Sequence, residues 1–381
     1  MKRSTKRILT THTGSLPRPD DLTEMLYARD RGESFDQAGL DARVRTVTAE
    51  IVRQQVDSGI DVVNDGEVSK ISYSTYVKER LTGFDGEGHL PGIGDLRDFP
   101  EFAQRFLGQL AVAAMKTPTC TGPIKWKDKT AMRKDVTNFK AALQGVKPAD
   151  TFLSAASPGV ISFFLQNAYY PSHEAYLSAL ADVMKEEYQA IYKGGFLLQI
   201  DCPDLAMSRH TQYTDADLAE FRKIVELHVE ALNHAVAGIP PDRMRLHLCW
   251  GNYEGPHHLD VPIADILDIV LKARPAGLSF EAANPRHGHE WQAFKKFKRK
   301  LDGKVLIPGV LDSCTNYIEH PELVAERLVK FAKIVGKENV IAGTDCGFAT
   351  FAALLTVDPK ITWAKFQAMA EGARLASEQL W

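Results

Sequence analysis

His247 and Cys249 are the residues whose types and spacing most directly suggest chemistry. They lie two positions apart in residues 243–250, which have the pattern of a β-strand. Residues i and i+2 of a strand point to the same face, so this imidazole and this thiol can reach a single point. Zinc binds His nitrogen at about 2.0–2.1 Å and Cys sulfur at about 2.3 Å. The pair therefore predicts a zinc site, provided that other ligands reach the same point.

Other candidate ligands follow further β-type runs, so the order of the elements matters. The runs are residues 8–13, 60–64, 151–155, 196–200, 244–248, 277–280, 305–308 and 340–342. Helical patterns lie between most of them, most clearly over residues 42–56, 174–192 and 215–235. Thr214 is the expected N-cap of the last helix, with acidic residues in its first turn. Strands alternating with helices along the whole chain imply a parallel sheet.

Eight strands favour an α/β fold of the (β/α)8 TIM-barrel type, in one domain over residues 1–381. The chain exceeds the ~250 residues of a typical barrel, and residues 84–135 account for the surplus as an insertion after the second strand. This segment, with a hydrophobic stretch at 107–115, is either a lid over the strand ends or a surface hairpin. A doubly wound sheet is the alternative fold, but residues 12–19 lack its glycine-rich G-x-G-x-x-G turn.

In a (β/α)8 barrel the chemistry lies at the C-terminal ends of the strands. Polar or thiol side chains follow most of the predicted strands: Ser15, Asp65, Glu67, Asp201, Cys202, His247, Cys249, Glu281, Asp312, Cys314, Asp345 and Cys346. One histidine, one carboxylate and two cysteines among them follow the neighbouring fifth, sixth and eighth strands. The predicted zinc ligands are thus His247, Cys249, Glu281 and Cys346. We also predict Asp201 and Asp312 as catalytic residues.

The charge of this ligand set indicates what the metal would do. Two thiolates, one carboxylate and a neutral imidazole give a Zn²⁺ site a net charge of −1. Such a sulfur-rich, anionic zinc is a poor Lewis acid and is better suited to holding a further thiolate. A free thiol with a pKa of ~8.5 is only about 3% ionised at pH 7, whereas coordination to zinc deprotonates it. The set therefore predicts alkyl transfer to a thiol, because alkylation weakens the sulfur–zinc bond and releases the product.

The same residues could also have roles that involve no catalysis. The zinc could be structural, although structural sites usually draw on closely spaced ligand pairs. Cys249 and Cys346 could be buried small hydrophobic residues, and Glu281 could pair with Arg286. Four further histidines fall in loops rich in Pro and Gly, where we expect them to be solvated: His257, His258, His287 and His289.

At these residues the chain resembles the catalytic C-terminal barrel of the cobalamin-independent methionine synthase family. The likeness spans nearly the whole chain and rests on the segments at 12–18, 65–67, 199–201, 247–249 and 343–348, together with Glu281. It implies a TIM barrel whose zinc holds a thiol acceptor. His247, Cys249, Glu281 and Cys346 match the family's zinc ligands. Ser15, Glu67 and Asp201 match positions that hold the amino-acid part of homocysteine, and two carboxylates suit an ammonium group.

Three departures from the family concern the substrates rather than the zinc. Full-length members carry a second, N-terminal barrel that helps bind polyglutamyl methylfolate, which we do not expect in a chain of 381 residues. The family's Asp-Glu-Pro is here Asp201-Cys202-Pro203. The family's proton-donating histidine after strand seven is missing from residues 309–314. The sequence thus predicts a relative that kept the zinc–thiolate device and changed its substrates.

The composition excludes several other classes of function. A net charge of −3, from 46 basic and 49 acidic residues, argues against a nucleic-acid or membrane-surface partner. Five cysteines without a C-x-x-C pair do not form a disulfide framework. Residues 1–9 lack the apolar stretch of a signal peptide, so we expect a cytoplasmic protein. A homo-oligomer is compatible with the sequence.

Three functions remain as alternatives. The first is methyl transfer to homocysteine or a similar thiol from methylfolate or another carrier, favoured by Glu67 and Asp201. The second is addition of a thiol to an electrophile, as in the similar epoxyalkane:coenzyme M transferases. Their sulfonate thiol would need cations, for which Arg18, Lys125, Lys127 and Arg286 are candidates. The third is non-catalytic zinc or thiol binding.

Overall fold

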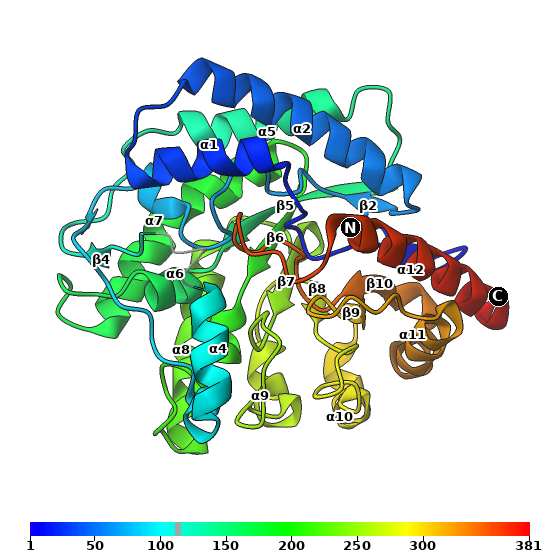
Figure 1. Ribbon diagram of the computed structural model, residues 1–381. Helices are drawn as coiled ribbons and strands as arrows, with labels where there is room; N and C mark the ends of the chain where they lie inside the picture. Colours follow the sequence, from blue (N-terminus) through cyan, green and yellow to red (C-terminus); the bar gives the residue numbers. More distant parts are fainter. Residues whose placement is uncertain (111–115) are drawn as a thin grey trace.

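The structure is a computed structural model that describes residues 1–110 and 116–381. Eight parallel strands form a barrel surrounded by helices (Figure 1), in the order β1-β10-β9-β8-β7-β6-β5-β2. A parallel bridge between Thr11 and Val62 closes it. The strands are β1 Leu9–Thr10, β2 Val62–Val63, β5 Asp150–Ala156, β6 Leu197–Asp201, β7 Met244–Leu248, β8 Gly277–Phe280, β9 Val305–Leu311 and β10 Ile341–Thr344. The predicted TIM barrel is confirmed, with each strand where a β-type run occurs.

Helices form the outer layer and cover the strands. They are α1 Asp20–Arg31, α2 Gln37–Asp57, α3 Val77–Arg80, α4 Pro100–Leu110, α5 Thr130–Ala142, α6 Pro158–Phe164, α7 His173–Lys193, α8 Leu218–Ala235, α9 Ile263–Val270, α10 Trp291–Lys296, α11 Pro321–Val335 and α12 Pro359–Leu380. The predicted N-cap Thr214 is wrong. Asp217 caps α8 and forms a capping box with Glu220, so the helix begins one turn later.

The alternation of residue types along strand β7 places His247 on the inner face of the barrel. Leu246 and Leu248 belong to the large hydrophobic cluster beneath the helices. The alternate residue Arg245 instead bonds Thr11 and the His12 carbonyl across the barrel. Because side chains alternate between the two faces of a strand, His247 shares the inner face with Arg245. The apolar residues of β7 therefore fix the face on which its histidine lies.

The insertion is built on a small antiparallel ribbon of β3 (Phe84–Asp85) and β4 (Thr119–Cys120). Between these strands lie a 3₁₀ turn, Gly94–Asp98, and helix α4. The predicted hydrophobic stretch at 107–115 lies partly outside the described residues. In the 3₁₀ turn Asp95 accepts hydrogen bonds from the Tyr253 hydroxyl and the Leu259 amide, at 2.7 and 2.9 Å. The insertion is thus fastened to the loop that follows β7.

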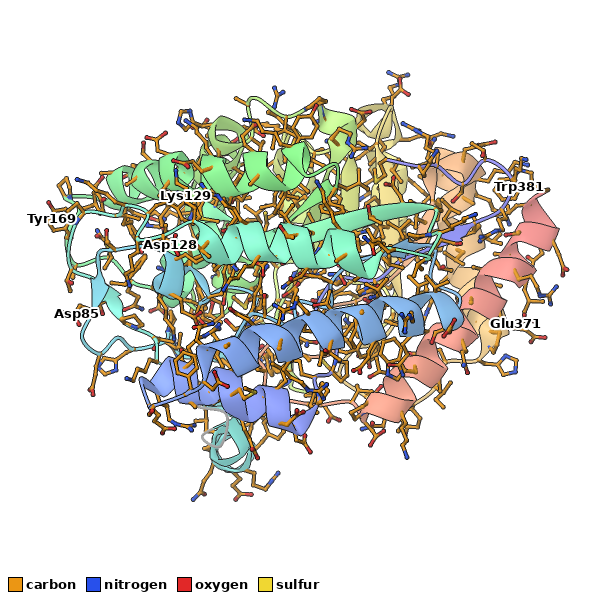
Figure 2. All side chains as sticks on the ribbon, turned by 90° about the horizontal axis from the view of Figure 1, so that it is seen from above. Asp85, Asp128, Lys129, Tyr169, Glu371 and Trp381 are labelled. Carbon is orange, nitrogen blue, oxygen red and sulfur yellow. The ribbon has the colours of Figure 1, made fainter. Side chains whose placement is uncertain are left out.

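Charged side chains lie on the outer surface. Asp128 and Glu371, labelled in Figure 2, are both exposed. Within residues 1–110 and 116–381, no helix has the length and apolar character needed to span a bilayer.

Candidate metal centre

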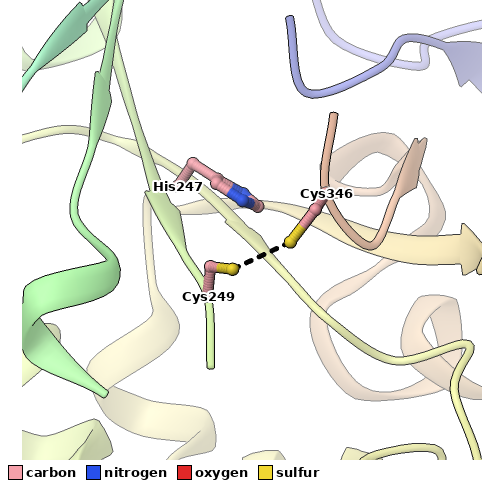
Figure 3. A group of neighbouring side chains, drawn as sticks. All are labelled: His247, Cys249 and Cys346. Atoms are coloured by element: carbon pink, nitrogen blue, oxygen red, sulfur yellow. Dashed lines mark hydrogen bonds between the residues drawn. The ribbon is translucent and has the colours of Figure 1, made fainter. Parts of the chain in front are cut away.

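The ends of β7 and β10 bring His247, Cys249 and Cys346 together. Each offers one ligand atom, and these atoms lie within 4.8 Å of one another. The two sulfur atoms are 2.8 Å apart, and the three side chains point toward one another (Figure 3). All three residues are buried. The predicted convergence of ligands from separate strands is therefore present.

Neighbouring groups hold each of these side chains in place. Register pairs His247 with Ser279, and the His247 Nδ1 lies 3.2 Å from the Ser279 hydroxyl. This contact leaves Nε2 as the free ring nitrogen, in the way that outer hydrogen bonds orient metal-binding histidines. The Gly251 amide donates to the Cys249 sulfur at 3.2 Å, and the Cys346 amide donates to the Ser313 hydroxyl at 3.1 Å.

Glu281 lies beside this group. It directly follows β8, whose last residue Phe280 pairs with Leu248 of β7. Its Oε1 accepts the Trp250 amide at 2.7 Å and lies 3.7 Å from the Cys346 sulfur. Its Oε2 accepts from the Asn284 side chain at 2.7 Å. The carboxylate is therefore bound to its own loop and adjoins one thiol.

A second carboxylate, Asp345, fixes the loop that follows β8. It accepts the backbone amides of Ala282, Ala283 and Asn284, each at 2.8 Å. Arg286, the alternative partner considered for Glu281, lies in the same loop and donates to the His258 carbonyl. The segment that carries Glu281 is thus held against the segment that carries Cys346.

Burial dominates the electrostatics of the three ligands. It lowers the pKa of His247 to about 3, with a smaller contribution from Arg245, so the ring is neutral. Burial is also the main cause that raises the pKa of Cys249 to about 11, opposed by the Cys346 contact and supported by the charge of Glu281. Burial and Cys249 raise the pKa of Cys346 well above the usual range. Thiols in this setting stay protonated unless a cation compensates the thiolates.

The donor set fits a divalent, sulfur-binding metal. A neutral imidazole and two thiols are ligand types that zinc accepts, and a bound dication would offset the cost that burial imposes on the thiolates. Glu281 is the nearest carboxylate, positioned by two hydrogen bonds. The residues therefore satisfy the chemical requirements of such an ion.

A cavity of about 930 Å³ opens over these ligands. Its inner part is lined by Ser15, Glu67, Asp201, His247, Cys249 and Cys346. Its outer part is lined by residues of the insertion: Leu90, Pro91, Ile93, Phe102, Arg105 and Phe106. The cavity is larger than one amino acid requires and reaches the size of drug-like sites.

The inner part is shaped around Glu67. This residue has φ 56°, in the left-handed region that is uncommon outside glycine. A Cβ on Gly14 would lie 2.3 Å from the Glu67 Oε1, so glycine leaves room for the carboxylate. The other oxygen, Oε2, is buried without a hydrogen-bond partner. A buried, unpaired carboxylate oxygen is costly unless a ligand satisfies it.

Asp201 stands on the same wall of the cavity. Its Oδ1 accepts from the Gln199 side chain at 2.7 Å. Burial, followed by the neighbouring Glu67, raises the pKa of Asp201 to about 8. Ser15 lies close to Gly347, where a Cβ would come within 2.0 Å of the serine hydroxyl. All three predicted substrate-binding residues therefore line the cavity.

Asp312, the other predicted catalytic residue, does not line the cavity. Its carboxylate accepts from the Cys314 amide and the Thr315 hydroxyl at 2.8 and 2.9 Å, within its own loop. The lining contains Cys314 and Thr315 but not Asp312. Burial raises the pKa of the Cys314 thiol well above its usual range. Asp312 thus shapes the loop that presents Cys314, and its catalytic role stays a prediction.

The sequence of the chain is similar to those of known proteins along nearly its whole length. No protein-family model matches the chain. A protein of Sulfolobus acidocaldarius named methionine synthase is 27% identical over 373 residues, which cover 97% of this chain and 93% of that protein. One of Thermococcus kodakarensis with the same name is 26% identical over 374 residues, covering 97% and 94%. The chain is a relative of the methionine synthases. The resemblance stated from its sequence motifs is thereby confirmed.

Solved structures of methionine synthases share the fold of this chain. A B12-independent methionine synthase from a Shewanella species, in complex with selenomethionine, has a TM-score of 0.72 at 19% identity, covering 98% of this chain and 99% of the other. A putative vitamin B12-independent methionine synthase from Listeria monocytogenes has a TM-score of 0.65 at 17% identity, with coverage of 98% and 99%. At these identities the likeness supports the barrel architecture.

One group of ionisable residues in this methionine synthase relative was not predicted. Asp260 is buried and lies within hydrogen-bonding distance of His210, His257 and His287. The expectation that His257 and His287 are solvated is wrong, since His287 is buried and stacks on Trp250 with ring centroids 4.1 Å apart. His257 lies three residues before Asp260 in the same loop, whereas His210 and His287 come from other loops, so no local sequence pattern indicates their contacts with Asp260. The other two histidines, 258 and 289, are exposed as expected.

Proposed function

We propose that the protein is a zinc-dependent methyltransferase that methylates homocysteine or a similar amino-acid thiol. One observation carries this proposal: the thiol and imidazole ligands line the same cavity as Ser15, Glu67 and Asp201. The names of the relatives support thiol methyl transfer as the reaction class. A metal that holds the acceptor sulfur and two carboxylates that hold its ammonium group would together bind one amino-acid thiol.

His247, Cys249, Cys346 and Glu281 are the proposed ligands of the zinc ion. When bound, zinc would supply ionisation of the acceptor thiol at neutral pH. Glu67, with its unpaired oxygen, would receive the ammonium group of the acceptor. This cation would also lower the raised pKa of Asp201, so that both groups face it as carboxylates. Ser15 would contact the same amino-acid moiety. These residues would fix the acceptor sulfur next to the rest of the cavity, where the methyl donor binds.

The insertion at 84–135 contributes to this cavity, so we propose that it covers the reacting groups within one domain. Leu90, Phe102 and Phe106 face the cavity, and the Phe106 ring lies 5.5 Å from that of Tyr253. Exclusion of water by such apolar side chains would favour attack on a methyl group over competing reactions. The role of a lid is therefore favoured over that of a surface hairpin.

The alternative of a sulfonate thiol, as in epoxyalkane:coenzyme M transferases, finds little support. Among the described lining residues Arg105 is the only Lys or Arg, and it belongs to the outer part of the cavity. Arg18 donates to the carbonyls of Glu67 and Ala349 instead. Acidic side chains at the inner end would repel a sulfonate and attract an ammonium group.

The test is a titration of the Co²⁺-substituted protein with homocysteine and, separately, with coenzyme M. The sulfur-to-cobalt charge-transfer absorption reports whether the added thiol reaches the metal. We expect a saturable change with homocysteine and none with coenzyme M. A response to coenzyme M alone would favour thiol addition to an electrophile. Silence with both would reject the proposed acceptor and favour a structural metal.

A further inference from the structure

A second group of possible metal ligands contains no cysteine. Asp95 belongs to the insertion, His210 lies in the segment after β6 and Asp260 in the segment after β7. Each offers one ligand atom, and these atoms lie within 4.8 Å of one another. All three side chains are buried. Two carboxylates and one imidazole from separate segments therefore converge inside the fold.

Several polar atoms of this group make no hydrogen bond. The Nδ1 of His210 lies 2.7 Å from the Oδ1 of Asp260, but the two atoms are not aligned for a hydrogen bond. Both of these atoms and the His210 Nε2 are buried and have no hydrogen-bond partner among the described residues. A buried polar atom without a partner is costly. An ion placed between the ring and the carboxylate would satisfy Nδ1 and Oδ1 together.

The other contacts of Asp260 leave its Oδ1 available to an ion. His257 and His287 each lie 2.9 Å from Oδ2, the second oxygen of this carboxylate. Glu290 lies 2.9 Å from His287 and balances the charge of that ring. Hydrogen bonds of this kind orient carboxylates that bind metals. The carboxylate of Asp260 is thus held with Oδ1 toward His210.

Asp95 is fixed by donors on the loop that follows β7. Its Oδ2 accepts the Tyr253 hydroxyl at 2.7 Å, and its Oδ1 accepts the Leu259 amide at 2.9 Å. An ionised carboxylate can accept about four hydrogen bonds, so both oxygens keep lone pairs for an ion. The Gly94 amide donates to the His210 carbonyl at 2.7 Å. The backbone of the insertion therefore contacts the segment that carries the imidazole.

We propose that Asp95, His210 and Asp260 bind a second divalent cation, which joins the insertion to the barrel. Carboxylate and imidazole ligands without sulfur suit Mn²⁺ or a similar first-row dication, whereas thiolates select softer metals. The two carboxylates balance the charge of such an ion. Ligands on opposite sides of an ion, with bonds of about 2.0–2.2 Å, lie about 4.4 Å apart. A shift of less than about 1 Å per side chain would therefore bring all three onto one ion.

The ion would act on the cavity through the insertion. His210 and Tyr253 line the cavity, and the insertion lines its outer part. Binding of one ion to Asp95 and to both barrel segments fastens the insertion at a single point. Because the three ligands converge only in the folded chain, ion binding stabilises this arrangement. The site is independent of the thiol ligands and extends beyond the proposed function.

Titration with Mn²⁺ tests the site in the protein whose thiols have been filled with one equivalent of Zn²⁺. The paramagnetic resonance signal of free Mn²⁺ loses intensity on binding, and we expect one further equivalent to bind. Asp95→Asn and His210→Gln should each weaken Mn²⁺ binding at least about tenfold. Asp98→Asn, at an exposed carboxylate of the same turn, should bind Mn²⁺ as the wild type does. Circular dichroism checks the fold of each variant.

Amide hydrogen exchange gives a second measurement, which reports on the insertion itself. Mn²⁺ should slow exchange of the Gly94 and Leu259 amides at least about tenfold in the wild type. It should leave both amides unaffected in Asp95→Asn. Exchange that Mn²⁺ does not change in the wild type would overturn the fastening of the insertion.

Lack of saturable Mn²⁺ binding to the wild type, or wild-type affinity in both Asp95→Asn and His210→Gln, would overturn the inference. The zinc site of the proposed function is judged separately, by the thiolate-to-cobalt absorption of the Co²⁺-loaded protein. That absorption should persist in Asp95→Asn. Its absence from a wild type that still binds one Mn²⁺ would reject the zinc site and retain the second ion.

Discussion

The sulfur atoms of Cys249 and Cys346, 97 residues apart in the chain, lie 2.8 Å from each other. One follows β7 and the other follows β10, with β8 and β9 between them in the sheet, so the curvature of the barrel brings the two sulfur atoms together. Burial keeps the pKa of both thiols above the usual range. Burial would make two thiolates at this distance costly, and a bound divalent metal would offset that cost.

Replacing either cysteine should remove the metal and leave the barrel folded. We expect Cys249→Ala and Cys346→Ala to retain less than about a tenth of the wild-type metal after dialysis, since each loses one of few ligands. The measurement is metal content by mass spectrometry, with circular dichroism to check the fold. Cys120→Ala, at a buried cysteine of β4, is the matched control and should keep its metal. Stoichiometric metal in both ligand variants would refute the assignment.

Neutralising Glu67 should affect amino-acid thiols selectively. Glu67→Gln keeps the size of the side chain and removes the charge that would face an ammonium group. We expect homocysteine affinity to fall at least about tenfold, as for loss of a charged hydrogen bond. Affinity for 3-mercaptopropionate, which has no ammonium group, should change little. An equal loss for both thiols in the Co²⁺ titration would contradict the proposed contact.

Gly14 tests the same contact through the backbone. In Gly14→Ala the new Cβ would lie 2.3 Å from the Glu67 Oε1, at a φ of 150° that L-residues rarely adopt. We expect the carboxylate to be displaced and the rate of homocysteine methylation to fall about 100-fold, because catalytic groups tolerate little displacement. Metal content should be unchanged. Gly122→Ala, where the closest atom is 3.8 Å away, is the control and should retain full activity.

His287 should make stability depend on pH on the alkaline side. Burial lowers its pKa, but hydrogen bonds with Asp260 and Glu290 outweigh this and raise it to about 10. The folded-state pKa thus lies above the unfolded value of ~6.5, so the protonated ring stabilises the fold fully below pH ~6.5. This contribution is lost as the pH rises through about 10.

Substitution should therefore remove a pH-dependent part of the stability. We expect the free-energy difference between wild type and His287→Gln to shrink by on the order of 2 kcal/mol between pH 6.5 and 10. Urea denaturation at several pH values measures it. His289→Gln, at an exposed histidine, should leave the pH profile unchanged. A difference for His287→Gln that does not vary with pH would contradict the assigned network.

Asp217 should contribute to stability as a helix cap. Its side chain accepts the Glu220 amide at 2.8 Å and Glu220 returns a bond to the cap. We expect Asp217→Ala to lower the free energy of unfolding by about 1 kcal/mol. Asp215→Ala, whose side chain is 95% exposed, should change it by less than ~0.5 kcal/mol. Equal effects in chemical denaturation would argue against the capping box.

Local patterns were sufficient to predict much of the fold. Strands β7 and β8 have the predicted bounds because their aliphatic residues are buried on the barrel's outer face and cross-strand pairs fix their register. Strands β1 and β2 are each only two residues long, although longer runs were expected. Residues beside them join β1 to β2 where the barrel closes, as Thr11 does with Val62, and this pairing depends on closure rather than on local propensity.

The sequence was sufficient to predict site residues that follow a strand and have the side chains of metal ligands. It was not sufficient to predict contacts between side chains of separate loops. His247 and Cys249 could be placed from the two-residue period of one strand, and Cys346 from the alternation of strands and helices. Burial of His287 could not, since it depends on Asp260, which follows a different strand. Nor could the exclusion of Asp312 from the lining, because its carboxylate is bound within its own turn.

The fastening of the insertion to Tyr253 has a consequence for binding. Tyr253 lies four residues beyond Cys249, so one loop carries a candidate metal ligand and the attachment point of the segment that lines the outer cavity. A shift of this loop would therefore move the Cys249 sulfur and the insertion together. Occupation of the outer cavity and binding of a metal by Cys249 would then be coupled through one segment of backbone.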